Sequence, residues 1–334
     1  MLARATLALT VAGTAPVAAQ QFPLPDRWHQ ALSSPTQTFA ELRIEHLDGD
    51  GRLDVLARSV PALGTPAWYA TRSGASASGE FTAPALVGSG HPVGDLNGDG
   101  RTDFARVLAT TVTPPLSTTF AVQLSNGAGD WLALAPQTIE WSVYSSILAK
   151  LAGADVDNDG RGDLVVYGQL LPHVYTVLGD GAGGLSNMIG HPYGAQTAVD
   201  LAAADLEGDG DTDLVLCTAA PDTVSVLRSV GPAWFLAPSV EHATSSSPTD
   251  LVLADFDVDG DVDAVFQCAP NNLLRYLAGD GAGGFAPSVD LAVPSGVLSD
   301  AIASDADDDG APDLVVSTYV ELGIFRGTPG AAPA

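Results

Sequence analysis

Six segments of the chain alternate acidic residues with other residues around an Asp-Gly pair, a pattern that could bind a hard metal cation. We number them acidic loops 1 to 6; each follows the pattern Asp-x-Asp-x-Asp-Gly-x-x-Asp. Loops 3 to 6 are acidic at positions 1, 3, 5 and 9: Asp155, Asp157, Asp159, Asp163; Asp205, Glu207, Asp209, Asp213; Asp255, Asp257, Asp259, Asp263; Asp305, Asp307, Asp309, Asp313. Loop 2 has Asp95, Asn97, Asp99 and Asp103. Loop 1 has Asp48, Asp50 and Asp54, but His46 stands at its position 1.

These side chains suit calcium, which takes roughly six to eight oxygen ligands in flexible geometry. Alternating acidic residues on a tight loop direct several carboxylates to one point, and the glycine permits the sharp turn. Asp and Gly also form turns without metal, but that alternative does not explain an aspartate at position 9 of all six loops. An EF-hand is excluded, because it requires Glu at position 12, where loops 2 to 6 have Arg106, Val166, Leu216, Phe266 and Val316. We therefore predict four to six bound calcium ions.

The spacing of the loops indicates a repeated structural unit. Their Asp-Gly pairs begin at residues 50, 99, 159, 209, 259 and 309, so the intervals are 49, 60, 50, 50 and 50 residues. Within one unit, the apolar runs 251–254, 264–266 and 273–277 are separated by the acidic loop and by turn residues, and Phe285 opens a fourth run. Four short antiparallel strands per repeat of this length are typical of a propeller blade.

We therefore predict an all-β fold, a six-bladed β-propeller with four antiparallel strands per blade. The strands that follow the loops, such as 164–166, are apolar at consecutive positions, as expected when both faces of a blade are covered. The last repeat lacks a fourth strand, and Phe22-Pro23-Leu24-Pro25 is similar to Phe285-Ala286-Pro287-Ser288. We expect this N-terminal segment to complete the last blade and close the ring.

The composition restricts the partners and the location. Acidic residues outnumber basic ones 40 to 13, and the net charge of −27 argues against nucleic acid or an anionic membrane as partner. Residues 1–19 have a basic start, an apolar run too short to span a bilayer, and small residues before a cleavage point. We predict that they form a signal peptide, that residues 20–334 are a single domain, and that the protein is secreted, to the extracellular space, the cell surface or the periplasm. Cys217 and Cys268 form either a disulfide between neighbouring blades or, as we expect, two separately buried thiols.

The chain resembles the FG-GAP/VCBS repeat family, which includes the integrin α-subunit propeller and fungal fucose-binding lectins. The acidic loops and the Gly-Asp-Gly-Ala-Gly-Gly-Phe turn at 279–285 carry the resemblance. It implies a propeller in which calcium lies between the first and second strands of each blade, held by the acidic positions named above. It does not imply a particular ligand, because members include adhesins, lectins and lyases.

Two sets of residues outside the loops are candidates for ligand binding. Asp200, Asp250 and Asp300 each lie five residues before a loop and could surround the mouth of the central channel, although capping of a strand start is the simpler interpretation. Trp141 and Tyr144 lie in the one interval that is lengthened to 60 residues, where an insertion could bind a ligand or serve only as filler.

The sequence favours a binding or adhesion module for an extracellular glycan or protein, with structural calcium. The six histidines share no repeat position, and Lys150 is the only lysine. No serine or cysteine stands in a nucleophile motif, so we predict no catalytic residue. The alternative is a calcium-dependent polysaccharide lyase or glycoside hydrolase on the same propeller, which would need basic or tyrosine side chains to converge in a cleft.

Overall fold

The computed structural model describes a large part of the chain, strand by strand. The described residues are 10–11, 37–45, 54–61, 67–71, 85–87, 90–111, 115–127, 131–140, 150–167, 173–193, 197–219, 222–231, 235, 240–244, 248–268, 273–287, 289–293, 298–305, 309–318 and 322–327. These residues form strands, turns and bends, and no helix.

The described strands form six sheets that follow one another along the chain. The first two are β2 Gln37–Glu45, β3 Asp54–Pro61, β4 Ala67–Thr71 and β5 Ala85–Val87; then β6 His91–Pro92, β7 Phe104–Thr111, β8 Ser117–Ser125, β9 Trp131–Ala133 and β10 Gln137–Glu140. The third and fourth are β11 Lys150–Ala154, β12 Asp163–Tyr167, β13 His173–Gly179 and β14 Leu185–Pro192; then β15 Thr197–Ala204, β16 Asp213–Ala219, β17 Thr223–Leu227 and β18 Val240–Ala243. The last two are β19 Pro248–Ala254, β20 Asp263–Cys268, β21 Leu273–Leu277 and β22 Val289–Ala292; then β23 Leu298–Ser304, β24 Asp313–Thr318, β25 Leu322–Phe325 and β1 Thr10–Val11.

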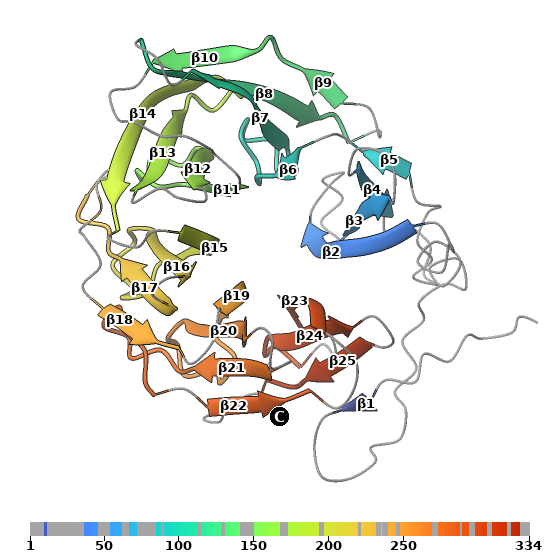
Figure 1. Ribbon diagram of the computed structural model, residues 1–334, viewed down its shortest axis with the longest axis vertical. Coiled ribbons are helices and arrows are strands. Elements are labelled where there is room, and N and C mark those ends of the chain that lie inside the picture. Colours follow the sequence, from blue (N-terminus) through green and yellow to red (C-terminus); the bar gives the residue numbers. More distant parts are fainter. Residues whose placement is uncertain are drawn as a thin grey trace, which may run out of the picture.

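The sheets are arranged around a common centre, like the blades of a propeller (Figure 1). The first strand of each sheet lies nearest the centre, and the later strands lie progressively farther out. Successive strands within a sheet pair antiparallel, as in β11 with β12 and β12 with β13. The chain is therefore an all-β protein of antiparallel sheets with propeller-like packing, as the repeat predicted.

The last sheet differs from the prediction in its outermost strand. Thr10 and Val11 pair with Gly323 and Ile324 of β25, and the two strands run parallel. The expectation of an antiparallel strand is wrong at this place, because similarity between two short segments carries no information on strand direction. The segment predicted to fill this position, residues 22–25, lies outside the described residues.

Apolar cores lie between neighbouring sheets and explain the consecutive apolar residues of the second strands. Leu164 and Val166 of β12 pack into the core shared with the second sheet, whereas Val165 packs into the core shared with the fourth. Successive side chains of a strand point to opposite faces, so both faces are buried only when a sheet lies between two others. Cys217 and Cys268 are free and buried in the core between the fourth and fifth sheets, which confirms two buried thiols.

The lengthened second repeat forms a long hairpin and one additional strand. Thr111 pairs with Ser117 at the end of β7 that is remote from acidic loop 2. In the additional strand β10, Gln137 donates from Nε2 to the Gly183 carbonyl (2.9 Å) and accepts at Oε1 from the Leu185 N–H (2.7 Å). The insertion therefore holds the β13–β14 turn of the third sheet. Trp141 and Tyr144 lie outside the described residues.

His191 of β14 makes the core between the third and fourth sheets sensitive to acid. Its ring nitrogen Nε2 lies 3.0 Å from Thr176 Oγ1, and its ring packs edge-on against Phe235. The side chain is 3% exposed. Burial, reinforced by the nearby His173, lowers the pKa of His191 to about 4.

We predict that replacing His191 with Gln removes a part of the acid sensitivity of folding. Between about pH 6.5 and pH 4 the unfolded chain binds a proton at His191 and the folded protein does not, so stability falls as the pH falls. The difference between the pKa of about 6.5 in the unfolded chain and about 4 in the folded protein corresponds to about 3 kcal/mol of folding free energy. Urea unfolding at pH 7 and pH 4.5 should show a smaller pH-dependent loss in His191→Gln than in the wild type. Equal losses would contradict the prediction, since all other titrating groups are common to both proteins.

Candidate metal sites in the acidic loops

Each described acidic loop joins the first strand of a sheet, which lies nearest the centre (Figure 1), to the second strand. Loops 2 to 5 are described completely, and loop 6 lacks Asp307. In loop 1, Asp48 and Asp50 lie outside the described residues, and Asp54 begins β3. The loops thus occupy the same edge of successive sheets, because each second strand begins at position 9 or, for β7, one residue later.

The aspartates at positions 1 and 5 fold the loop around themselves without any metal. In loop 5, Asp255 Oδ1 accepts from the Asp259 N–H (3.1 Å) and Oδ2 accepts from the Gly260 N–H (3.0 Å). Asp259 Oδ1 accepts from the Asp261 N–H (2.9 Å). The same three bonds recur in loops 3, 4 and 6. Local carboxylate-to-backbone bonds of this kind stabilise tight turns.

Position 4 requires a left-handed backbone, which the sequence pattern did not reveal. Its residues in loops 2 to 5 are Gly98, Asn158, Gly208 and Val258, with φ of 76°, 56°, 68° and 57°. Glycine and asparagine adopt this conformation readily, whereas a β-branched residue is strained in it. Val258 is also 45% exposed, so little packing offsets the strain.

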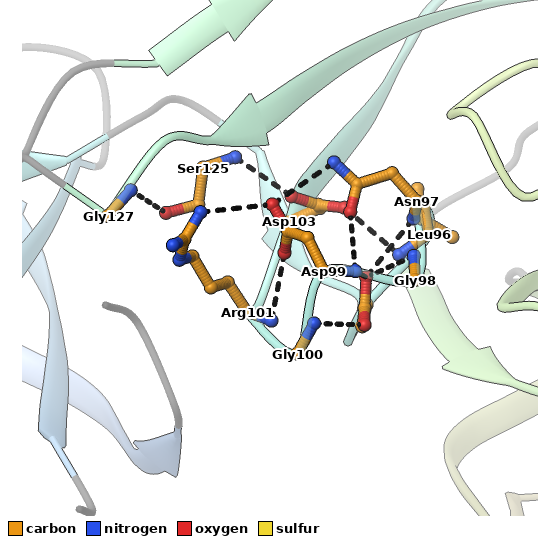
Figure 2. A network of polar contacts seen from close by, with 10 residues as sticks. Leu96, Asn97, Gly98, Asp99, Gly100, Arg101, Asp103, Ser125 and Gly127 are labelled. Carbon is orange, nitrogen blue, oxygen red and sulfur yellow. Dashed lines mark hydrogen bonds and ion pairs between the residues drawn. The ribbon is translucent and has the colours of Figure 1, made fainter. Parts of the chain in front are cut away.

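The aspartates at position 9 connect each loop to a second turn of the same sheet. Asp263 is fully buried; its Oδ2 accepts from the Phe256 N–H (2.9 Å) and its Oδ1 from the Gly279 N–H, beyond the third strand (2.8 Å). Asp163 and Asp213 bond to the equivalent N–H groups. Figure 2 shows Asp103 with Leu96 and Ser125 in the second sheet. The sequence identified these residues only as metal ligands, but the structure gives them this additional role.

One oxygen of the position 3 carboxylate has no hydrogen-bond partner in loops 3 and 5. Asp157 Oδ1 and Asp257 Oδ1 are buried and accept no hydrogen bond, and Asp257 is only 8% exposed. Oxygen atoms of Asp155, Asp157 and Asp159 lie within 4.8 Å of one another, as do those of Asp255, Asp257 and Asp263. A buried carboxylate oxygen without a partner, beside two other carboxylates, is costly unless a cation joins them. The all-oxygen donor set fits calcium.

The pKa values of the loop carboxylates reflect this crowding. Burial, with a smaller contribution from the neighbouring carboxylates, raises the pKa of Asp103 and Asp163 to about 6 against the lowering effect of the backbone N–H groups. Burial and then the charge of Asp259 raise the pKa of Asp257. In loop 4, burial and Asp213 raise the pKa of Glu207 to about 7, while Arg228 lowers it. A bound cation would relieve this repulsion between like charges.

The candidate ligand residues near the centre have structural contacts where their side chains are described. Asp200 accepts from the Tyr167 hydroxyl (3.1 Å) and the Leu251 N–H (2.8 Å), and it pairs with Lys150 (3.4 Å). It therefore joins the third, fourth and fifth sheets. β-Bulges lie beside Glu41, Asp200 and Asp300 and at Asp250, whose φ is 49°. Ligand binding by Asp200, Asp250 and Asp300 stays a prediction.

We predict that replacing Val258 with Gly stabilises the protein by roughly 1 kcal/mol, since the strain of a left-handed valine is removed. The measurement is urea unfolding of the purified variant with calcium held constant. Val289→Gly is the matched control, because this strand valine is 49% exposed and lies in regular β structure. The control should lose about 0.5–1 kcal/mol. A Val258→Gly loss as large as that of the control would show that the loop is not strained.

Comparison with known proteins supports the repeat and the fold. No curated protein matches the chain in sequence. A protein of unknown function from Dyadobacter fermentans has a similar structure, with 17% identity, coverage of 90% of this chain and 93% of that chain, and a TM-score of 0.52. This similarity concerns the fold alone.

Two structures of weaker similarity have known activities. An Agrocybe aegerita lectin that recognises non-reducing terminal N-acetylglucosamine shares 15% identity, with coverage of 84% of this chain and 74% of that chain and a TM-score of 0.49. The exotype rhamnogalacturonan lyase YesX shares 14% identity, with a TM-score of 0.43. The match to YesX covers 89% of this chain and about half, 55%, of the lyase.

Among the described residues, no helix is both long and apolar enough to cross a membrane. The model of the FG-GAP-like repeat matches residues 155–216 and 205–266, which contain acidic loops 3, 4 and 5. This match confirms the family resemblance predicted from the sequence for this part of the chain: residues 155–266 contain FG-GAP-like repeats.

Proposed function

We propose that the protein is a secreted, six-bladed, calcium-binding propeller that serves as a binding or adhesion module for an extracellular glycan or protein. Calcium has a structural role in this proposal. Residues 1–19, which include β1, act as the signal peptide of the precursor, and residues 20–334 form the propeller domain after its removal. A ring of six blades is supported by the contact between β2 of the first sheet and β23 of the last.

The observation that carries the calcium proposal is the unpartnered carboxylate oxygen of Asp257. Loop 5 is already folded by its own hydrogen bonds, and it holds this buried oxygen close to oxygens of Asp255 and Asp263. Two carboxylates about 5 Å apart repel by roughly 3 kcal/mol at an effective dielectric of about 20. A divalent cation turns this repulsion into attraction.

The residues that would hold calcium are those at positions 1, 3 and 5, together with the carboxylate at position 9 and the backbone carbonyl at position 7. When bound, the ion supplies positive charge that joins the carboxylates of one loop. Four to six ions per chain are proposed, since loops 3 and 5 have the most converged carboxylates described and loop 1 has His46 at position 1.

A binding module is favoured over an enzyme by the environment of the basic side chains. Lys150 pairs with Asp200, and His191 is buried against Thr176 and Phe235. Arg275 pairs with Asp290, and Arg161 with Asp159. Lyases and hydrolases need acid and base groups that reach a substrate, and these described side chains are engaged with other parts of the protein.

We predict that the protein binds glycans without cleaving them. A glycan array should give calcium-dependent binding to a restricted set of sugars, while polysaccharides incubated with the protein yield no unsaturated sugar product. Boiled protein is the control for both measurements. Accumulation of unsaturated or shortened sugars would instead establish the enzyme alternative, and a blank array would direct the search to protein partners.

We predict that the effect of Asp257→Ala on stability changes sign when calcium is added. In EGTA the variant should melt at or above the wild-type temperature, because a buried charge has been removed. At a tenfold excess of calcium over its Kd, the variant should be less stable by about 1.4 kcal/mol, the contribution of one lost site. Melting curves in both conditions test this, and elemental analysis should show one ion fewer.

Asp263→Ala is the contrasting variant. It leaves the Gly279 N–H without its acceptor, at a cost of about 1–3 kcal/mol, and leaves the Phe256 N–H with the Ala254 carbonyl alone. It should therefore lose stability in EGTA as well as in calcium. A wild-type melting temperature that does not respond to chelation would overturn the calcium proposal.

A further inference from the structure

We infer that acidic loop 4 is closed by an internal cation, the guanidinium group of Arg228, and does not bind calcium as its neighbours do. The inference rests on the proposed calcium function and assigns one loop a different partner. Loop 4 contains the only Glu at position 3 among the six loops, Glu207, whose longer side chain extends toward Arg228. Arg228 follows β17, directly before Ser229, whose N–H bonds to Asp213.

The two side chains form an ion pair at the edge of the loop. Arg228 Nε lies 3.7 Å from Glu207 Oε1, and the side chains are 30% and 19% exposed. Arg228 Nε and Glu207 Oε2 are buried and make no hydrogen bond, so charge attraction is what joins the two groups. The position 3 carboxylate, which has an unpartnered oxygen in loops 3 and 5, therefore has a cationic partner in loop 4.

Comparison between loops of the same chain supports the assignment. The residues equivalent to Arg228 are Leu124, Leu178 and Ala278 in the second, third and fifth sheets and Arg326 in the sixth, where the position 3 residue Asp307 lies outside the described residues. Three carboxylates approach within 4.8 Å in loops 3 and 5, but no such group forms in loop 4, although all four of its acidic residues are described. Among loops 3, 4 and 5, the three-carboxylate group is thus absent from the one loop whose position 3 side chain pairs with an arginine.

The next sheet covers this pair. A Cβ atom added to Gly283, in the turn between β21 and the isolated bridge at Phe285, would lie 2.2 Å from Arg228 Nη2 and 2.5 Å from Glu207 Oε2. The turn of the fifth sheet therefore rests on the ion pair of the fourth. In the third sheet the corresponding Gly183 rests on the apolar side chains of Leu124 and Leu134. The guanidinium group of Arg228 is thus held between the fourth and fifth sheets. Its positive charge would repel a calcium ion bound at loop 4.

The test counts calcium ions after loop-specific changes, at pH 8 so that Glu207 is ionised. Asp159→Asn, Asp209→Asn and Asp259→Asn alter position 5 of loops 3, 4 and 5. Elemental analysis after gel filtration, with calorimetric titration, should show one ion fewer for Asp159→Asn and for Asp259→Asn, and no change for Asp209→Asn. Loss of an ion in Asp209→Asn would overturn the inference.

A gain-of-site variant provides the converse test. Arg228→Leu places the side chain of the third sheet at this position, and it should bind one more calcium ion than the wild type. Adding Asp209→Asn to it should remove that ion again. If Arg228→Leu gains no ion, Arg228 is not what excludes calcium. If the changes in loops 3 and 5 also lose no ion, the calcium proposal itself fails, and the two failures are thus distinguished.

Discussion

The carboxylate at position 9 is the interaction on which each blade-like sheet depends. In the fifth sheet the two oxygens of Asp263 hold the acidic loop, through Phe256, and the next turn, through Gly279. Both connections leave the same edge of the sheet, so one buried side chain at the start of the second strand reaches both. Without this carboxylate the Gly279 N–H would lack an acceptor, which is costly.

This solution creates the electrostatic problem that the loops must resolve. Burying a carboxylate favours its protonated form, and burial raises the pKa of Asp103 and Asp163 to about 6. Positions 1 and 5 offset their charge with backbone N–H groups, but position 3 leaves one buried oxygen without a partner in loops 3 and 5. The repeat therefore concentrates negative charge that needs a cation, and a side chain can take that place, as Arg228 does beside Glu207.

The sequence predicted the features that depend on local patterns. The spacing of the Asp-Gly pairs indicated the loops, because Asp and Gly form tight turns. Consecutive apolar residues such as Leu164 to Val166 indicated strands covered on both faces, because successive side chains of a strand point to opposite faces. It did not predict the left-handed position 4, since Val258 breaks the residue preference. It also did not predict three contacts between residues that are distant in sequence. These are the hydrogen bond of Asp263 with Gly279, the hydrogen bond of Gln137 with Leu185, and the parallel pairing of Thr10 with Gly323.

Specific recognition is best sought where the sheets differ, since the shared loop geometry serves the fold. Most of the described differences stabilise contacts between sheets: Gln137 holds the turn at Gly183, Asp200 joins three sheets, and Arg228 lies under Gly283. A side chain committed in this way cannot change partners without loosening a neighbouring sheet. A ligand is therefore expected to contact exposed side chains near these contacts between sheets. One such side chain is Leu132 of β9 in the second sheet, which is 60% exposed. Function on such a repeated scaffold arises from the surface residues that the repeat leaves free to vary.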